Sequence, residues 1–134
     1  MVVVRNGVNL EGFKPGPRDN GLREELGIDQ DEFVATYVGT LGMAHGLASV
    51  IKTAEITRDD RIRYLLVGEG AEKDELVARA RGMPNVSFRP AVSRDAVPAL
   101  YRTADVCLVP LRAVPLFRSF VPSKMFEILA CGRP

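Results

Sequence analysis

Short apolar segments alternate with helix-patterned segments along the whole chain, and this alternation constrains the fold more than any other feature. The apolar segments are rich in β-branched, aliphatic and aromatic residues, and they do not alternate with polar residues. Strands buried on both faces of a parallel sheet have this continuous apolar pattern. The sequence predicts such strands at 33–39, 62–68, 85–88 and 105–111.

The segments between the predicted strands have helical features. Residues 47–57 place Leu47, Val50, Ile51 and Ala54 at helical spacing. Further helices are predicted at 72–81, at 97–104 with Pro98 in the first turn, and at 122–131 with Gly132 as the C-terminal cap. Alternating strands and helices predict a doubly wound α/β fold, in which helices cover both faces of a parallel sheet.

The size and charge of the chain exclude several classes of protein. With 134 residues it is long enough for one domain and too short for two ordinary ones. A formal net charge of +1 does not favour nucleic acid or anionic lipid as a partner. Cys107 and Cys131 form no CxxC pair, so a reduced intracellular compartment is expected and a zinc site is not.

Neither end of the sequence resembles the natural end of an α/β domain. The MVVV segment at 1–4 is too short for a signal peptide, and we interpret it as a strand or the end of a linker. The helix predicted to end near Gly132 should return to the sheet through another strand. We therefore expect 1–134 to be one domain taken from a longer protein, with 1–16 as an interdomain lead-in.

Ligands of doubly wound sheets bind outside the carboxyl ends of the strands. The loops that follow the predicted strands are therefore the places to search for a site. They span 39–46, 68–72, 89–93 and 110–123.

The start of the last helix carries three side chains suited to a nucleotide. Unpaired N–H groups at a helix start favour phosphate, and Ser123 and Lys124 would add a hydroxyl and a cation. One turn further, Glu127 would accept hydrogen bonds from a ribose diol. Alternatively, Ser123 is a simple helix cap, and Lys124 and Glu127 form a solvated i,i+3 pair. Spacing alone favours this second interpretation.

The glycine-rich loop at 39–46 would let backbone approach a ligand at Gly39 and Gly42, while amides near Gly46 face an anion. His45 would contact a phosphate or a sugar. The alternative is a plain strand-to-helix turn with a surface histidine, since the loop does not match GxGxxG.

The other strand ends offer weaker signals. Gly68 and Gly70 flank Glu69, which suggests either backbone fitted under a ligand or a tight turn with an exposed carboxylate. At Ala91 and Val92 the backbone is placed to pair with the edge of a base, or simply to leave a strand. Asp105 stands at the opposite, amino end of its strand, where a structural role is expected.

These segments, in this order, resemble the C-terminal donor-binding domain of GT-B fold glycosyltransferases of family 4 (group 1), a Rossmann-like three-layer α/β/α domain. The segments that carry the resemblance are RNGVNLEGFKP (5–15), YVGTLGMAHGL (37–47), LLVGEGAEKDEL (65–76), NVSFRPAV (85–92), LYRTADVCLVP (100–110) and SKMFEILACGRP (123–134).

The resemblance implies a nucleotide-sugar donor, an acceptor held by a separate N-terminal domain, retaining chemistry, and no metal or cofactor. Glu127 matches the second glutamate of the family's E-x7-E motif, which holds the ribose. Ser119 replaces the first glutamate, and Thr40 and His45 replace the donor-loop arginine and lysine. Lys124 would supply a replacement cation, so Lys124 and His45 are the candidates for stabilising the departing diphosphate.

The PSKxxE helix start resembles a sub-branch that transfers hexoses or amino- and deoxysugars from UDP donors in cell-surface polysaccharide synthesis. A cytoplasmic location is implied, with a peripheral position at the inner membrane face left open for a longer protein. Membrane contact is expected only through parts outside this sequence. Two alternatives remain open: a sugar-nucleotide 2-epimerase of the same fold, and a non-catalytic α/β interaction module.

Overall fold

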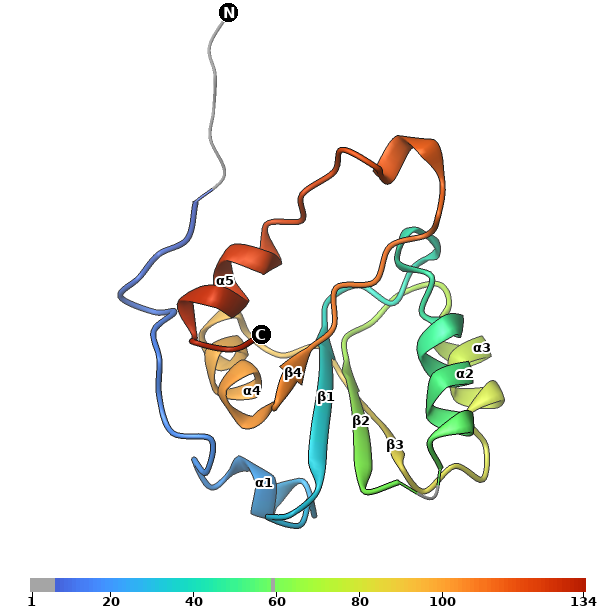
Figure 1. The fold of residues 1–134 in the computed structure, drawn as a ribbon, viewed down its shortest axis with the longest axis horizontal. Coiled ribbons are helices and arrows are strands. Elements are labelled where there is room, and N and C mark those ends of the chain that lie inside the picture. Colours follow the sequence, from blue (N-terminus) through green and yellow to red (C-terminus); the bar gives the residue numbers. More distant parts are fainter. Residues whose placement is uncertain (1–6, 59) are drawn as a thin grey trace, which may run out of the picture.

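The computed structural model describes residues 7–58 and 60–134, and it has a sheet of four parallel strands in the order β3-β2-β1-β4 (Figure 1). The MVVV segment interpreted as a strand or linker end lies outside the described residues. The predicted parallel sheet is confirmed. Its strands are β1 (Phe33–Val38), β2 (Ile62–Val67), β3 (Val86–Arg89) and β4 (Val106–Cys107).

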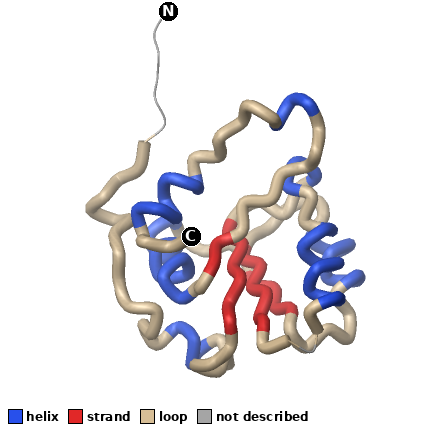
Figure 2. The backbone as a smooth tube through the Cα atoms, in the orientation of Figure 1, coloured by secondary structure: helices blue, strands red, loops and turns tan. Residues whose placement is uncertain are grey.

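Helices cover both faces of the sheet, as the alternating pattern predicts (Figures 1 and 2). On one face lie α2 (Ala48–Ile56) and α3 (Lys73–Arg79), and on the other lie α4 (Val97–Thr103) and α5 (Lys124–Ala130). The predicted three-layer α/β/α class is therefore confirmed. The sequence did not reveal the short helix α1 (Leu22–Glu25) or the 3-10 helices η1 (Met43–His45), η2 (Arg94–Ala96) and η3 (Pro115–Phe117).

The predicted strand at 105–111 is the one that differs most from the structure. β1 pairs with β2 along six residues, whereas β4 pairs with β1 only at Val106 and Cys107. One further bond joins the Leu108 amide to the Thr36 carbonyl at 2.7 Å. Pro110 has no N–H to extend the ladder, so the chain leaves the sheet there.

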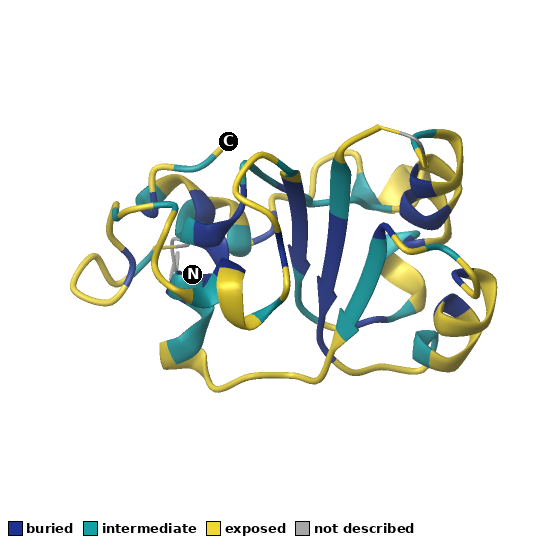
Figure 3. Cartoon of the chain, turned by 90° about the horizontal axis from the view of Figure 1, so that it is seen from below, coloured by how far each residue is buried: buried dark blue, intermediate teal, exposed yellow. Residues whose placement is uncertain are grey.

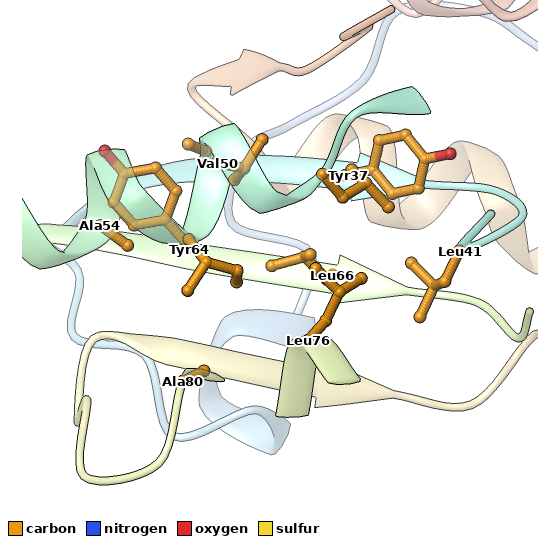
Figure 4. Close-up of a cluster of buried hydrophobic side chains, with 11 residues drawn as sticks. Tyr37, Leu41, Val50, Ala54, Tyr64, Leu66, Leu76 and Ala80 are labelled. Carbon is orange, nitrogen blue, oxygen red and sulfur yellow. The ribbon is translucent and has the colours of Figure 1, made fainter. Parts of the chain in front are cut away.

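Alternate residues of the central strands enter different hydrophobic clusters, which explains their continuous apolar sequence. Tyr37 and Leu66 pack with the helices α2 and α3 (Figure 4). Leu65 and Val67, one position away, pack with Leu100 of α4 on the other face. The central strands β1 and β2 are consequently the most buried part of the sheet (Figure 3). This burial on both faces supplies most of the hydrophobic stabilisation.

A separate cluster joins the N-terminal lead-in to α4 and α5. Phe13 is buried there against Tyr101, at 6.4 Å between ring centres, together with Cys107 and Cys131. Both cysteines are free, and burial raises the pKa of the Cys107 thiol to about 12. The cluster also contains Ile128, and it fixes the position of α5 relative to the sheet.

Asp105 has the structural role that its position at the amino edge of the sheet predicts. Its Oδ2 accepts a hydrogen bond from the Val34 amide at 2.7 Å, and its Oδ1 lies 2.7 Å from Arg18 Nε. Fully buried Arg23 lies 3.6 Å from the same carboxylate and donates to three backbone carbonyls. Burial lowers the pKa of Arg23, and Asp105 opposes that shift.

Candidate functional site

A pocket with a volume of about 360 Å³ lies at the carboxyl edge of the sheet, at the ends of β1, β2 and β3. It brings together six of the residues that the sequence predicts for a site: Gly39, Thr40, Gly68, Glu69, Ala91 and Val92. Val38, Val67 and Val97 complete the lining. A mostly apolar cleft at this edge is the usual ligand position of doubly wound folds.

The order of the strands makes the end of β1 a topological switch point. From β1 the chain moves outward through β2 to β3, and it then crosses back to place β4 on the other side of β1. The connections that leave β1 and β3 therefore run to opposite faces of the sheet. This divergence leaves the crevice in which ligands of such sheets bind.

The glycines of the second loop are required by the neighbouring loop. The Gly39 amide donates to the Val67 carbonyl at 2.9 Å and the Leu41 amide to Glu69 at 2.8 Å, so the pairing of β1 and β2 continues beyond the strands. A Cβ on Gly68 would overlap the Gly39 carbonyl oxygen, and one on Gly70 would overlap that of Leu41. Their small size therefore has a structural cause whether or not a ligand binds.

Lys124 reaches back from α5 to the end of β1. Its Nζ donates to the Val38 carbonyl at 2.9 Å and lies 4.2 Å from the centre of the Tyr37 ring. A Cβ on Gly39 would come within 2.5 Å of the same Nζ. Burial lowers the pKa of Lys124 to about 8, although Glu127 opposes the shift. The lysine is thus a partly desolvated cation held against Gly39, which lines the pocket.

The alternative interpretation of the helix start holds only for the position of Ser123. Ser123 is the N-cap residue of α5, which begins at Lys124, but its side chain is exposed and makes no capping bond. Lys124 and Glu127 form no ion pair, because the lysine bonds to Val38 and the glutamate pairs with Arg94. The tertiary structure, rather than i,i+3 spacing, decides both partners.

His45, the last residue of η1, lies beside Tyr37, with the two ring centres 5.8 Å apart. Burial lowers the pKa of its imidazole, and the charge of Lys124 lowers it further. The Tyr37 hydroxyl donates to the Thr40 carbonyl at 2.7 Å, and burial raises the pKa of this phenol. The two predicted cation candidates are therefore brought together around a tyrosine that sequence reasoning assigned only to the core.

Glu127 lies on α5 with its side chain only 12% exposed, and Arg94 Nη2 donates to its Oε1 at 2.7 Å. Arg94 is the first residue of η2, two positions after the pocket residue Val92. Sequence reasoning missed Arg94, since a lone arginine in a loop carries no pattern. Its position two residues after the predicted base-edge backbone was the only available signal.

Eight predicted residues lie outside the pocket lining: Gly42, His45, Gly46, Gly70, Ser119, Ser123, Lys124 and Glu127. Gly46 has a left-handed backbone at φ 58° and packs against Arg112. Ser119 is exposed on the connection between η3 and α5. Within the described ranges, no group of three or more His, Cys, Asp or Glu residues could hold a metal ion. None of the helices described is both long and apolar enough to cross a membrane.

Lys124→Met should remove a pH dependence of stability that the wild-type chain shows between pH 8 and 10. With a folded pKa of about 8 against an ordinary value of 10.5, the folded lysine binds fewer protons than the unfolded one in this range. Stability contributed by this group therefore rises with pH there, by about 1 kcal/mol or more after allowance for its partial exposure.

Denaturant unfolding of both chains at several pH values would measure the difference. The free energies of unfolding of the two chains must be subtracted at each pH, because Cys107 is present in both. Its raised pKa changes stability in the opposite direction above pH 9. A difference between the two chains that stays constant across this range would contradict the desolvation of Lys124.

Comparison with known proteins places the chain in a family. The profile of the family described as Glycosyl transferases group 1 matches residues 32–134, which is most of the chain. The chain belongs to the group 1 glycosyl transferases. The resemblance drawn from the sequence is thereby confirmed at the level of the family, while the PSKxxE sub-branch stays a prediction.

Two curated relatives and one solved structure show the extent of the similarity. The chain is 35% identical over 115 residues to the putative colanic acid biosynthesis glycosyl transferase WcaI of Escherichia coli K12, covering 84% of this chain and 28% of that protein. It is 33% identical over 140 residues to a D-inositol 3-phosphate glycosyltransferase of Mycobacterium sp. strain KMS, covering 98% and 30%. The chain thus spans about a third of the length of these relatives.

The Anabaena protein HepE, solved in complex with UDP and glucose, shares the fold with a TM-score of 0.79 at 24% identity. The match covers 99% of this chain and 36% of HepE. At this identity the likeness establishes the fold only. It agrees with the Rossmann-like α/β architecture described above.

Proposed function

We propose that residues 1–134 form the donor-binding domain of a glycosyltransferase that uses a nucleotide sugar, with a UDP-sugar as the donor. The reaction transfers a hexose, or an amino- or deoxysugar, to a glycan or lipid-linked acceptor in cell-surface polysaccharide synthesis. The acceptor is held by a separate N-terminal domain, to which residues 1–16 lead. The chemistry is retaining and needs no metal, and the isolated domain binds nucleotide weakly and transfers nothing.

The observation that carries this proposal is the pocket at the ends of β1, β2 and β3, with Lys124 held against its Gly39 floor. Family membership supplies the reaction class. The UDP bound to HepE supports UDP as the nucleotide, and the name of WcaI supports a polysaccharide product. The pocket lies at the edge of the sheet where the fold class binds its ligands.

In the proposed complex, the backbone at Ala91 and Val92 pairs with the base and Glu127 accepts hydrogen bonds from the ribose. Lys124 and His45 face the diphosphate and stabilise the negative charge that develops as the sugar departs. Lys124 is desolvated and already fixed by Val38, so its charge acts with little screening and little reorganisation. Bound diphosphate would also favour the protonated form of both side chains.

The two alternatives receive no comparable support. Neither relative named above is an epimerase or a non-catalytic protein. The replacements at Thr40, His45 and Ser119 would be expected in an inactive interaction module. However, the partly buried Lys124 of α5 places a cation at the end of β1, where such a module needs none. A 2-epimerase would need its own acid and base outside the donor-binding domain.

Titration of the chain with UDP, GDP and ADP, followed by backbone amide shifts, tests the proposal. UDP should shift the amides of 39–42, 91–92 and 123–127 most strongly, because these segments surround the nucleotide in the proposed complex. Amides of the amino edge, such as Val34, should not respond. Shifts confined to other segments, or the same response to all three nucleotides, would contradict the proposal.

A further inference from the structure

A cluster of four side chains links the N-terminal lead-in to the Glu127 carboxylate. Phe13, buried at its centre, packs against Tyr101 of α4. The Arg94 guanidinium lies 5.3 Å from the centre of the Phe13 ring and donates to Glu127. Tyr101 is also near this carboxylate, since Glu127 adds to the effect of burial in raising its pKa. Arg94 and Tyr101 therefore both lie near the Glu127 carboxylate, and Phe13 of the lead-in contacts both of them.

The ion pair between Arg94 and Glu127 is asymmetric in exposure. The Arg94 side chain is 70% exposed, whereas that of Glu127 is 12% exposed. Pairs between two exposed side chains contribute little because solvent screens them. A largely buried carboxylate, in contrast, depends on its few partners for both charge compensation and orientation. Arg94 therefore matters more to Glu127 than its own exposure suggests.

The pair leaves Glu127 able to accept further hydrogen bonds. Arg94 contacts Oε1 alone at 2.7 Å, and an ionised carboxylate has about four acceptor sites. Arg94 itself is steadied by the face of Phe13, a cation–π contact at a distance where such contacts are attractive. Arg94, held by Phe13, thus orients the Glu127 carboxylate. Acceptor sites of the carboxylate that Arg94 does not use stay free for a ligand.

We propose that Arg94 is a positioning residue for nucleotide recognition: supported by Phe13, it fixes the Glu127 carboxylate in the orientation that accepts the ribose diol of a nucleoside diphosphate. The proposal rests on the proposed function and deepens it. Arg94 acts through Glu127 and does not touch the base or the phosphates. Its removal should therefore weaken recognition of the ribose hydroxyls more than recognition of the rest of the nucleotide.

Calorimetric titration with UDP and 2′-deoxy-UDP would test this proposal, because the ratio of the two affinities isolates the contact with the 2′-hydroxyl. We expect the wild-type chain to prefer UDP by about tenfold, as a hydrogen bond to a charged acceptor allows. Arg94→Gln should reduce this preference to about threefold or less, since the freed carboxylate samples other rotamers. Arg94→Lys should retain an intermediate preference, because lysine keeps the charge without the planar fork.

Arg79→Gln is the matched control, since Arg79 is also an exposed arginine in an ion pair, with Glu75 on α3, far from the pocket lining. It should leave the preference unchanged. Thermal unfolding would confirm that each variant is folded, and Arg94→Lys would give the decisive ratio if Arg94→Gln were not.

The possible outcomes separate this proposal from the one it rests on. A wild-type chain that binds neither nucleotide would overturn the proposed function. A chain that binds UDP but shows no preference over 2′-deoxy-UDP would overturn the ribose role of Glu127 and this inference with it. If Arg94→Gln left the preference intact, or weakened both nucleotides equally, the positioning role alone would be wrong.

Discussion

Asp105→Ala should destabilise the chain by about 3 kcal/mol, because it removes the carboxylate that compensates a fully buried arginine. Arg23 would keep its three backbone carbonyls but lose its charged partner at 3.6 Å. The Val34 amide, near the amino end of β1, would lose its hydrogen-bond acceptor, and Arg18 would lose its ion pair. Urea unfolding measures the change in the free energy of unfolding.

Asp31→Ala is the control for this prediction. Asp31 also pairs with an arginine, Arg61, but their side chains are 61% and 63% exposed, so its loss should cost less than about 1 kcal/mol. The UDP affinity of folded Asp105→Ala should equal that of the wild type, since Asp105 lies at the amino edge and the pocket at the carboxyl edge. Equal destabilisation by the two substitutions would contradict the assigned role of the buried network.

Gly68→Ala should lower the free energy of unfolding by a similar amount, about 3 kcal/mol, and should also disrupt the pocket. At φ +151° the backbone of Gly68 disfavours an L side chain, and a new Cβ would overlap the Gly39 carbonyl oxygen. Strain of about 1–3 kcal/mol adds to the cost of forcing two packed backbones apart. The loops after β1 and β2 would separate, and UDP binding should fall with stability.

Gly82→Ala separates these two causes. Gly82 also has a positive φ, at +78°, but a Cβ there would meet nothing within 4 Å. Its substitution should therefore cost only the backbone strain, about 1 kcal/mol. Thermal and denaturant unfolding of the two variants would measure the difference. Equal losses would show that the close approach of the two loops is not what requires glycine at 68.

The fold class could be predicted because burial on both faces of the sheet leaves a continuous apolar pattern in the sequence of the central strands. A strand such as β1 contributes Tyr37 to one cluster and Val38 to another, so both faces need apolar residues and the pattern becomes continuous. β4 is the exception: its apolar sequence at 105–111 reflects packing by Leu108 and Val109, while Pro110 ends the backbone pairing after two residues. Hydrophobicity predicted its burial and could not predict its hydrogen bonds.

The site could be predicted only as far as topology determines it. Six predicted residues share one pocket because the carboxyl ends of parallel strands meet at one edge. Side-chain partners depend on tertiary contacts instead. Lys124 bonds to Val38, 86 positions earlier, and Glu127 pairs with Arg94, 33 positions earlier, so no local spacing could reveal either. Tyr37 was hidden by its place in an apolar strand.

The most direct test of the account is the affinity of UDP for the wild-type chain and for Glu127→Ala, measured by calorimetry. Glu75→Ala, which removes an exposed glutamate from α3, is the control and should bind UDP as the wild type does. We expect Glu127→Ala to bind UDP about tenfold more weakly or worse, since hydrogen bonds to a charged acceptor are lost. Undiminished binding by Glu127→Ala would contradict the assignment of this site.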